Sequence, residues 1–163
     1  MSKLTVFDKF ICENLDSAYR FAYTYMKNKE DAEDVVYDSV LEAMNSLHRL
    51  KNADSIKPWF FKIIANTALT ALHRSQRTVL TDFTAEEHHA LDTYEDDYTN
   101  LTTNEVLSCL GEDYRSIVIL KVCEDMTFGE IAAVLGISEN TVKTRFYRAV
   151  KLLKTYMEED GHE

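Results

Sequence analysis

The chain has 163 residues, of which 45% are hydrophobic and 28% are charged, the ordinary balance of a globular protein. Its formal net charge is −10 at pH 7, whereas proteins that bind nucleic acid usually carry a basic footprint. Four glycines and one proline are few for a fold built from hairpins and tight turns, so we expect an all-α protein. No apolar run approaches the roughly 20 residues of a membrane-spanning helix. We therefore expect no membrane insertion and a cytoplasmic location.

The three cysteines, Cys12, Cys109 and Cys123, are odd in number and far apart, and none belongs to a Cys-x-x-Cys motif. A zinc site or a disulfide framework needs closer spacing or nearby histidine partners. We expect reduced, mostly buried thiols, no metal site and no cofactor.

Charge is distributed unevenly along the chain. No Asp or Glu occurs in residues 56–81, and every charged side chain in residues 140–154 is positive. The acidic residues are concentrated in residues 30–42 and 82–97. An acidic protein with two basic segments can still bind DNA locally, so the net charge does not exclude that function.

Apolar residues at steps of three and four predict two helices in the first part of the chain. The two stripes are Leu15, Ala18, Ala22 and Tyr25, then Val36, Val40, Ala43 and Leu47. Asn28 and Asp31, between them, resemble the N-terminal cap of the second helix, whose acidic first turn complements the helix dipole.

A third helix is expected from Trp59 to about Arg74, after a loop over residues 50–57, with Pro58 in its first turn. Its aromatic residues fit two interpretations. They would stack unpaired bases beside Lys62 and Asn66, or they would form a core, which the helical spacing of Trp59, Phe60 and Ile63 favours.

The periodicity fails between Gln76 and Asn100, where the chain is polar and acidic, so we expect a flexible linker there. Short helices are then expected over residues 104–110 and 112–122. The pair His88-His89 beside Glu86 and Glu87 raises the alternative of a metal-dependent enzyme, but adjacent histidines point apart and metal ligands need rigid support.

The strongest local motif runs from Thr127 to Val142. Thr127 and Glu130 have the spacing of a capping box, Gly136 suits a left-handed helix end, and Ser138 caps the next helix. This is the pattern of a helix-turn-helix, with a core of Ile131, Leu135, Ile137 and Val142. A two-helix packing motif with a solvated basic face is the alternative. The agreement of caps, glycine, core and charge favours DNA binding through Lys143, Thr144, Tyr147 and Arg148.

The order of these parts resembles the extracytoplasmic-function (ECF) sigma factors of bacterial RNA polymerase. The run from Asp31 to Val36, followed by Trp59 to Asn66, is similar to the family's region 2. The stretch from Leu110 to Ala149 is similar to region 4. The resemblance implies two small helical domains, with region 2 in residues 1–77, an acidic linker in residues 78–100 and region 4 in residues 101–163.

The resemblance also implies a role for individual residues. The expected contacts with the polymerase core, through its largest subunit, are made by Asp34, Val35, Asp38 and Leu41. The expected contacts with the minus-ten element are made by Asn52, Ala53, Asp54, Ser55, Lys62, Asn66 and Arg74. The expected contacts with the minus-thirty-five element are made by Ser138, Asn140, Thr141, Lys143, Thr144, Tyr147 and Arg148, with Arg145 on phosphate.

By this resemblance the chain is a promoter-specificity subunit without catalytic residues, and not an enzyme. Its partners would be the polymerase core (largest subunit and flap), promoter DNA and an anti-sigma factor, in a stress response. The chain ends soon after Met157, so we expect regulation from outside. Tyr37 stands where family members often have glutamine, and the region around Arg74 and Arg77 is less basic than usual. The alternative is a helix-turn-helix activator that binds duplex DNA only.

Overall fold

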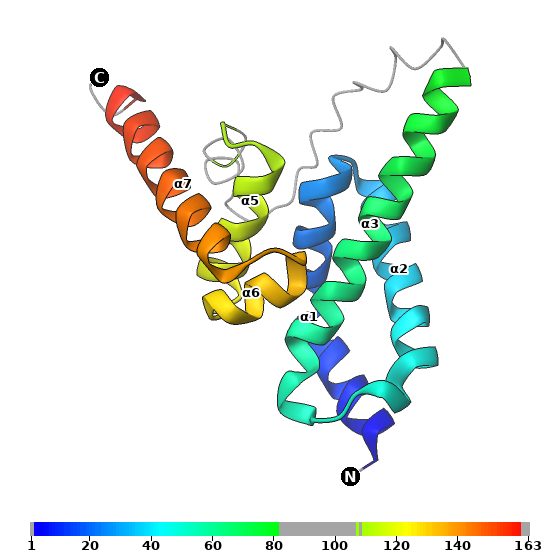
Figure 1. The fold of residues 1–163 in the computed structure, drawn as a ribbon. Helices are drawn as coiled ribbons and strands as arrows, with labels where there is room; N and C mark the ends of the chain where they lie inside the picture. Colours follow the sequence, from blue (N-terminus) through cyan, green and yellow to red (C-terminus); the bar gives the residue numbers. More distant parts are fainter. Residues whose placement is uncertain (1, 82–106, 108, 161–163) are drawn as a thin grey trace. The chain divides into compact units, whose positions relative to one another are not determined.

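The computed structural model describes residues 2–81, 107 and 109–160, and this described part is helical without a strand (Figure 1). The all-α fold expected from the composition is therefore confirmed. The chain divides into two compact units, residues 1–94 and 95–163.

The first unit consists of three long helices that each contact the other two (Figure 1). They are α1 (Lys3–Met26), α2 (Lys29–Ser46) and α3 (Ile56–Thr81), and the short turns η1 (Leu47–Arg49) and η2 (Ala53–Ser55) connect α2 to α3. The centre of the unit is aromatic. Phe10 contacts Phe60 edge to face with ring centroids 5.7 Å apart, and Phe21 contacts Phe61 at 5.3 Å.

Helix α1 begins well before Leu15, the first residue of the expected stripe. The side chain of Ser2 caps the helix by accepting a hydrogen bond from the Thr5 N–H, and Phe7 and Phe10 are already buried. The helix that the stripe predicted is present, with Ala18, Ala22 and Tyr25 buried, whereas Leu15 lies at the edge of the stripe and is 48% exposed.

The boundary between α1 and α2 is as predicted. Lys27 adopts a left-handed conformation with φ 62°, and its N–H donates to the Tyr23 carbonyl at 2.9 Å. Asn28 then caps α2, its Oδ1 accepting from the Asp31 N–H at 2.8 Å.

Helix α3 begins at Ile56 and continues to Thr81, so it is longer at both ends than expected. The loop predicted over residues 50–57 contains η2 and the first residues of α3, with Pro58 in the first turn as predicted. The helix also passes residue 77, where the linker was expected to follow. The remainder of that linker lies outside the described residues, as do His88-His89 and most of the helix expected over residues 104–110.

The second unit contains α5 (Glu112–Val118), the π-helical turn η4 (Ile119–Cys123), α6 (Phe128–Leu135) and α7 (Glu139–Asp160). Together, α5 and η4 occupy the helix predicted over residues 112–122. Leu110, Val118 and Ala149 form a buried cluster against which Tyr114 and Leu153 pack. Because α7 contacts both α5 and α6, one long helix closes the core of this unit (Figure 1).

The three cysteines are all exposed, so the expectation that they are mostly buried is wrong. Cys12, for example, lies on a different side of α1 from the buried residues Phe7 and Phe10. In the described part of the chain, every helix is too short or too polar to span a lipid bilayer. Within the same residues, no three His, Cys, Asp or Glu side chains gather as metal ligands would.

Candidate nucleic-acid interface

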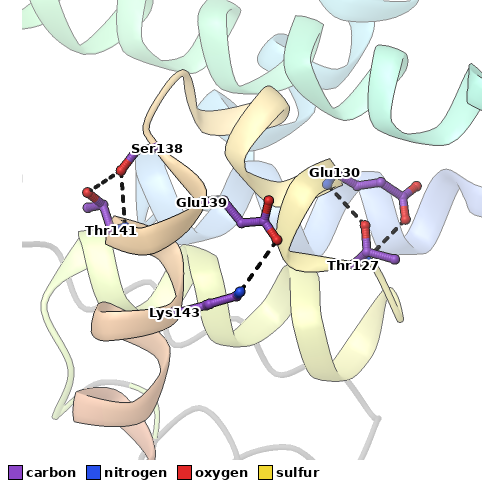
Figure 2. A network of polar contacts seen from close by, with 6 residues as sticks. All are labelled: Thr127, Glu130, Ser138, Glu139, Thr141 and Lys143. Atoms are coloured by element: carbon purple, nitrogen blue, oxygen red, sulfur yellow. Dashed lines mark hydrogen bonds and ion pairs between the residues drawn. The ribbon is translucent and has the colours of Figure 1, made fainter.

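Helices α6 and α7 form a helix-turn-helix whose first helix is fixed by a reciprocal cap. The Thr127 Oγ1 accepts from the Glu130 N–H at 3.1 Å, and the Glu130 carboxylate accepts from the Thr127 N–H at 3.0 Å (Figure 2). Gly136 ends α6 in the left-handed conformation with φ 69°. Each of these features was predicted from the motif, and each is confirmed.

The start of α7 is held by Ser138 and Thr141. The Ser138 Oγ accepts from the Thr141 N–H at 3.1 Å, and the two hydroxyl groups are hydrogen-bonded at 2.7 Å (Figure 2). Ser138 is therefore the predicted N-cap. Because both hydroxyls already form hydrogen bonds within the protein, a DNA contact through either one must share or replace such a bond.

The two sides of α7 differ in burial. Val142 and Ala149 are fully buried, while Lys143, Thr144, Tyr147 and Arg148 are exposed, as is Asn140. Arg145 is half-buried. The four side chains predicted to face outward therefore do so, on a helix whose charges from Lys143 to Lys154 are all positive. A rigid helix with such a face fits the DNA major groove.

Two of the outward side chains also have partners within the unit. The Lys143 Nζ lies 3.7 Å from the Glu139 carboxylate (Figure 2). It also lies 6.0 Å from the centre of the Phe128 ring. The Tyr147 ring lies 6.2 Å from the same Phe128 ring and 5.6 Å from Phe146. Neither Glu139 nor Phe128 was predicted as a functional residue, although the one-turn spacing from Glu139 to Lys143 is a known ion-pair signal.

In the first unit, the loop before α3 is an ordered turn. Asn52 caps η2, its Oδ1 accepting from the Asp54 N–H at 3.1 Å, and the Ser55 N–H donates to the Asn52 carbonyl at 3.0 Å. All four of the predicted minus-ten residues in this turn, from Asn52 to Ser55, are exposed. The turn therefore presents a preformed polar surface rather than a loose segment.

Lys62, Asn66 and Arg74 are exposed on α3, but they do not share one stripe. Lys62 and Asn66 lie one turn apart, whereas Arg74 is roughly 80° around the helix axis from Asn66. The structure brings the first two together and leaves Arg74 on a different line along the helix.

The aromatic residues of α3 belong mainly to the core. Phe60 and Phe61 have no exposed surface, and Trp59 is half-buried with its ring 6.4 Å from that of Phe7. Phe60 and Phe61 cannot stack bases from this position, so the core interpretation that the spacing favoured is confirmed for them. Ile63 is half-buried.

The predicted polymerase-binding residues of α2 separate into two groups. Asp34, Asp38 and Leu41 are exposed on one side of the helix, whereas Val35 is 2% exposed and packs in the core. The side chain of Val35 is therefore not available to a partner, which corrects its place in the predicted set. Met44 was not predicted as part of this surface, but it is 49% exposed and lies next to Tyr37 and Leu41 on the exposed side of α2.

Each of the two units matches a known protein family. The family description "Sigma-70 region 2" matches residues 10–78, and "Sigma-70, region 4" matches residues 103–153. The chain is 38% identical to RNA polymerase sigma factor SigV of Bacillus subtilis (strain 168) over 145 residues, which cover 88% of this chain and 86% of that protein. It is 25% identical over 163 residues to the ECF RNA polymerase sigma factor SigE of Mycolicibacterium smegmatis, covering 96% of this chain and 63% of that protein.

A solved structure has a similar fold. It is the sigma factor RpoE from Bartonella quintana in complex with the anti-sigma factor NepR, with a TM-score of 0.76 at 21% identity, covering 93% of this chain and 96% of that chain. That likeness concerns the fold, whereas the two family matches and the sequence relatives show that the chain belongs to the ECF group of the sigma-70 family. It is an alternative sigma factor, a subunit that binds RNA polymerase core and directs transcription initiation at promoters. An activator that binds duplex DNA alone does not account for the match to region 2.

Proposed function

We propose that this sigma factor recognises its promoter through two surfaces, one in each unit, while α2 attaches it to the polymerase core. The observation that carries the proposal is the capped helix-turn-helix, whose second helix buries Val142 and turns Lys143, Tyr147 and Arg148 outward. A helix presented in this way meets base edges with its N-terminal part.

The upstream, minus-thirty-five element is assigned to the start of α7. Lys143 and Arg148 donate to guanine acceptors, while Thr144 and Tyr147 contact neighbouring bases. Arg145 is half-buried at the side of this face, which suits a phosphate contact. The remaining proposed contacts come from the helix start: Ser138, Asn140 and Thr141.

The minus-ten element is assigned to η2 and α3. The exposed turn from Asn52 to Ser55 captures a base flipped out of the melted duplex, and Lys62 and Asn66 hold the strand beside it. Flipping costs a few kcal/mol, which a preformed binding surface on a protein already bound to polymerase offsets. The absence of acidic residues from Ile56 to Thr81 supports this role, because no carboxylate of that segment repels the phosphates. Arg74, on a different line along the helix, would contact the strand further along.

The attachment to core is assigned to Asp34, Asp38 and Leu41 on the largest subunit, with a second contact between the region 4 unit and the flap. Val35 is left out because it is buried. The exposed neighbours Tyr37 and Met44 extend the surface and give it an apolar centre beside two carboxylates. Such a mixture of apolar and charged groups is ordinary for a dissociable interface.

We divide the chain into a region 2 domain in residues 1–77, a linker in residues 78–100 and a region 4 domain in residues 101–163. Because α3 continues to Thr81, the linker begins as helix before it becomes the acidic segment. The acidic charge between two DNA-binding surfaces would discourage binding to DNA in the absence of core.

We further propose that an anti-sigma factor restrains this protein, in a stress response in the cytoplasm, and that it has no catalytic activity. The related fold of RpoE with NepR supports this regulation by analogy.

Run-off transcription with Bacillus subtilis core polymerase tests the proposal. The wild-type chain should direct initiation from a subset of promoters in a genomic library. The variant Lys143→Ala with Arg148→Ala should lose this activity and still co-elute with core. Lys151→Ala with Lys154→Ala removes the same charge later on α7 and should keep promoter choice. Core that initiates equally well without the chain would contradict the proposal.

A further inference from the structure

Phe128, the first residue of α6, lies at the centre of a set of contacts around the proposed DNA-binding face. Its ring centroid is 5.6 Å from that of Phe146 and 6.2 Å from that of Tyr147. The Lys143 Nζ lies 6.0 Å from the same centroid. Two of the side chains assigned to base recognition therefore lie beside one aromatic ring that is not itself part of α7.

The Phe128 ring is in turn held in place by its surroundings. The capping box of Thr127 and Glu130 fixes the backbone at the start of α6. The Lys121 Nζ donates to the Met126 carbonyl at 3.2 Å and lies 4.5 Å from the Phe128 ring centroid. Lys121 thus connects η4, the turn before α6 and the ring. A cation over an aromatic face and aromatic rings in edge contact each have a preferred geometry.

Fixing Lys143 and Tyr147 in this way has a consequence for binding. The Lys143 side chain is about half exposed and Tyr147 is 62% exposed, and Lys143 has several rotatable bonds that a DNA contact must order. Ordering such a side chain at an interface is unfavourable, and a side chain already held near its bound orientation loses less freedom.

We propose that Phe128 is a positioning residue for promoter recognition, which orients Lys143 and Tyr147 toward the base edges without touching the DNA. This inference rests on the proposed role of α7. It assigns to a residue of the first helix a part in sequence preference that the family match does not assign. The alternative is that Phe128 contributes only to packing.

The test uses selection from a random upstream duplex pool by the full chain bound to core polymerase. Phe128→Leu and Phe128→Met keep an apolar side chain and remove the ring, and Phe128→Tyr keeps the ring. We expect the ring-less variants to bind the wild-type element about tenfold less tightly, the upper range for an aromatic contact. They should also relax base preference at the positions where Lys143→Ala or Tyr147→Ala relaxes it. At the position that Arg148→Ala relaxes, they should keep the wild-type preference. Phe128→Tyr should restore the wild-type motif.

Tyr114→Leu provides the matched control, because Tyr114 packs on the buried cluster of the same unit. It should lower thermal stability and leave the selected motif unchanged. If Phe128→Leu and Phe128→Met weaken all sites equally and select the wild-type motif, Phe128 only packs and the inference is wrong. A wild-type chain that selects no upstream motif would instead overturn the proposed role of α7, and the inference with it.

Discussion

Glu139 and Lys143 form an ion pair across one turn at the start of α7, with 3.7 Å between Oε1 and Nζ. Both side chains are about half exposed, so the pair contributes little to stability. Its importance lies in its position, because Lys143 is also assigned to base recognition. In the proposed complex, the Glu139 carboxylate would lie near the DNA, beside the Lys143 ammonium group that is proposed to bind a base.

The first prediction concerns Glu139→Gln. Removing the carboxylate should strengthen binding to duplex DNA of any sequence by about two- to fivefold, the range of an exposed ion pair. The reason is that Lys143 no longer has a competing partner and the phosphates no longer meet a negative charge. Fluorescence anisotropy with unrelated duplexes at several salt concentrations measures the effect.

Glu158→Gln is the matched control for this variant, since it removes the same charge at the other end of α7 and should have no effect. Weaker binding by Glu139→Gln, together with lost preference at a cytosine, would show that Glu139 contacts a base itself.

The second prediction uses two glycines of the helix-turn-helix that respond oppositely to the same substitution. Gly136 has φ 69°, so Gly136→Ala should destabilise the unit by roughly 1–2 kcal/mol. Gly129 lies within α6, where an added Cβ would meet atoms only at an ordinary 3.9 Å, so Gly129→Ala should stabilise by about 0.5–1 kcal/mol.

Thermal unfolding followed by circular dichroism measures both shifts. The single tryptophan, Trp59, lies in the first unit, so its fluorescence transition should not change in either variant. If both substitutions change the melting temperature by the same amount in the same direction, Gly136 does not need the left-handed conformation assigned to it.

Local chemistry explains which parts of the fold were predictable. Asn28, Thr127, Gly136 and Ser138 act on backbone groups within a few residues, so their spacing alone predicted the helix ends that the structure has. The start of α1 was missed because its evidence is tertiary. Phe7 and Phe10 belong to the core through contacts with α3, which lies far away in the sequence.

The candidate site was predictable to a similar extent. The outward face of α7 follows from helical periodicity, but the partners of Lys143 and Tyr147 do not, because Phe128 comes from another helix. Val35 was placed on the docking surface from the resemblance, whereas packing against the neighbouring helices buries it. The exposed cysteines have the same explanation, since which side of a helix is covered depends on its neighbours.

The third prediction concerns attachment to core. Asp34→Arg combined with Asp38→Arg should abolish co-elution with core polymerase and leave the helical content unchanged, because both side chains are exposed. The physical reason is that two carboxylates facing the partner become two cations of the wrong sign.

The matched control is Glu33→Arg, tested against the single variants Asp34→Arg and Asp38→Arg. Glu33 is exposed on the same helix but about 100° around the axis from Asp34, so its reversal should leave co-elution intact. Loss of co-elution in all variants alike would indicate a general effect of charge rather than a docking surface.

If the exposed face of α7 selects the upstream promoter element as proposed, two arginines of that helix separate base contacts from phosphate contacts. Arg148→Ala should weaken binding to the preferred element by about 1–3 kcal/mol and relax preference at one position. Arg145→Ala should weaken binding to all sites alike and flatten the salt dependence. The most direct measurement is selection from a random duplex pool by each variant bound to core polymerase. We expect a changed motif for Arg148→Ala and an unchanged motif for Arg145→Ala. An Arg148→Ala variant that selects the wild-type motif with lower affinity would show that Arg148 contacts phosphate and does not read a base.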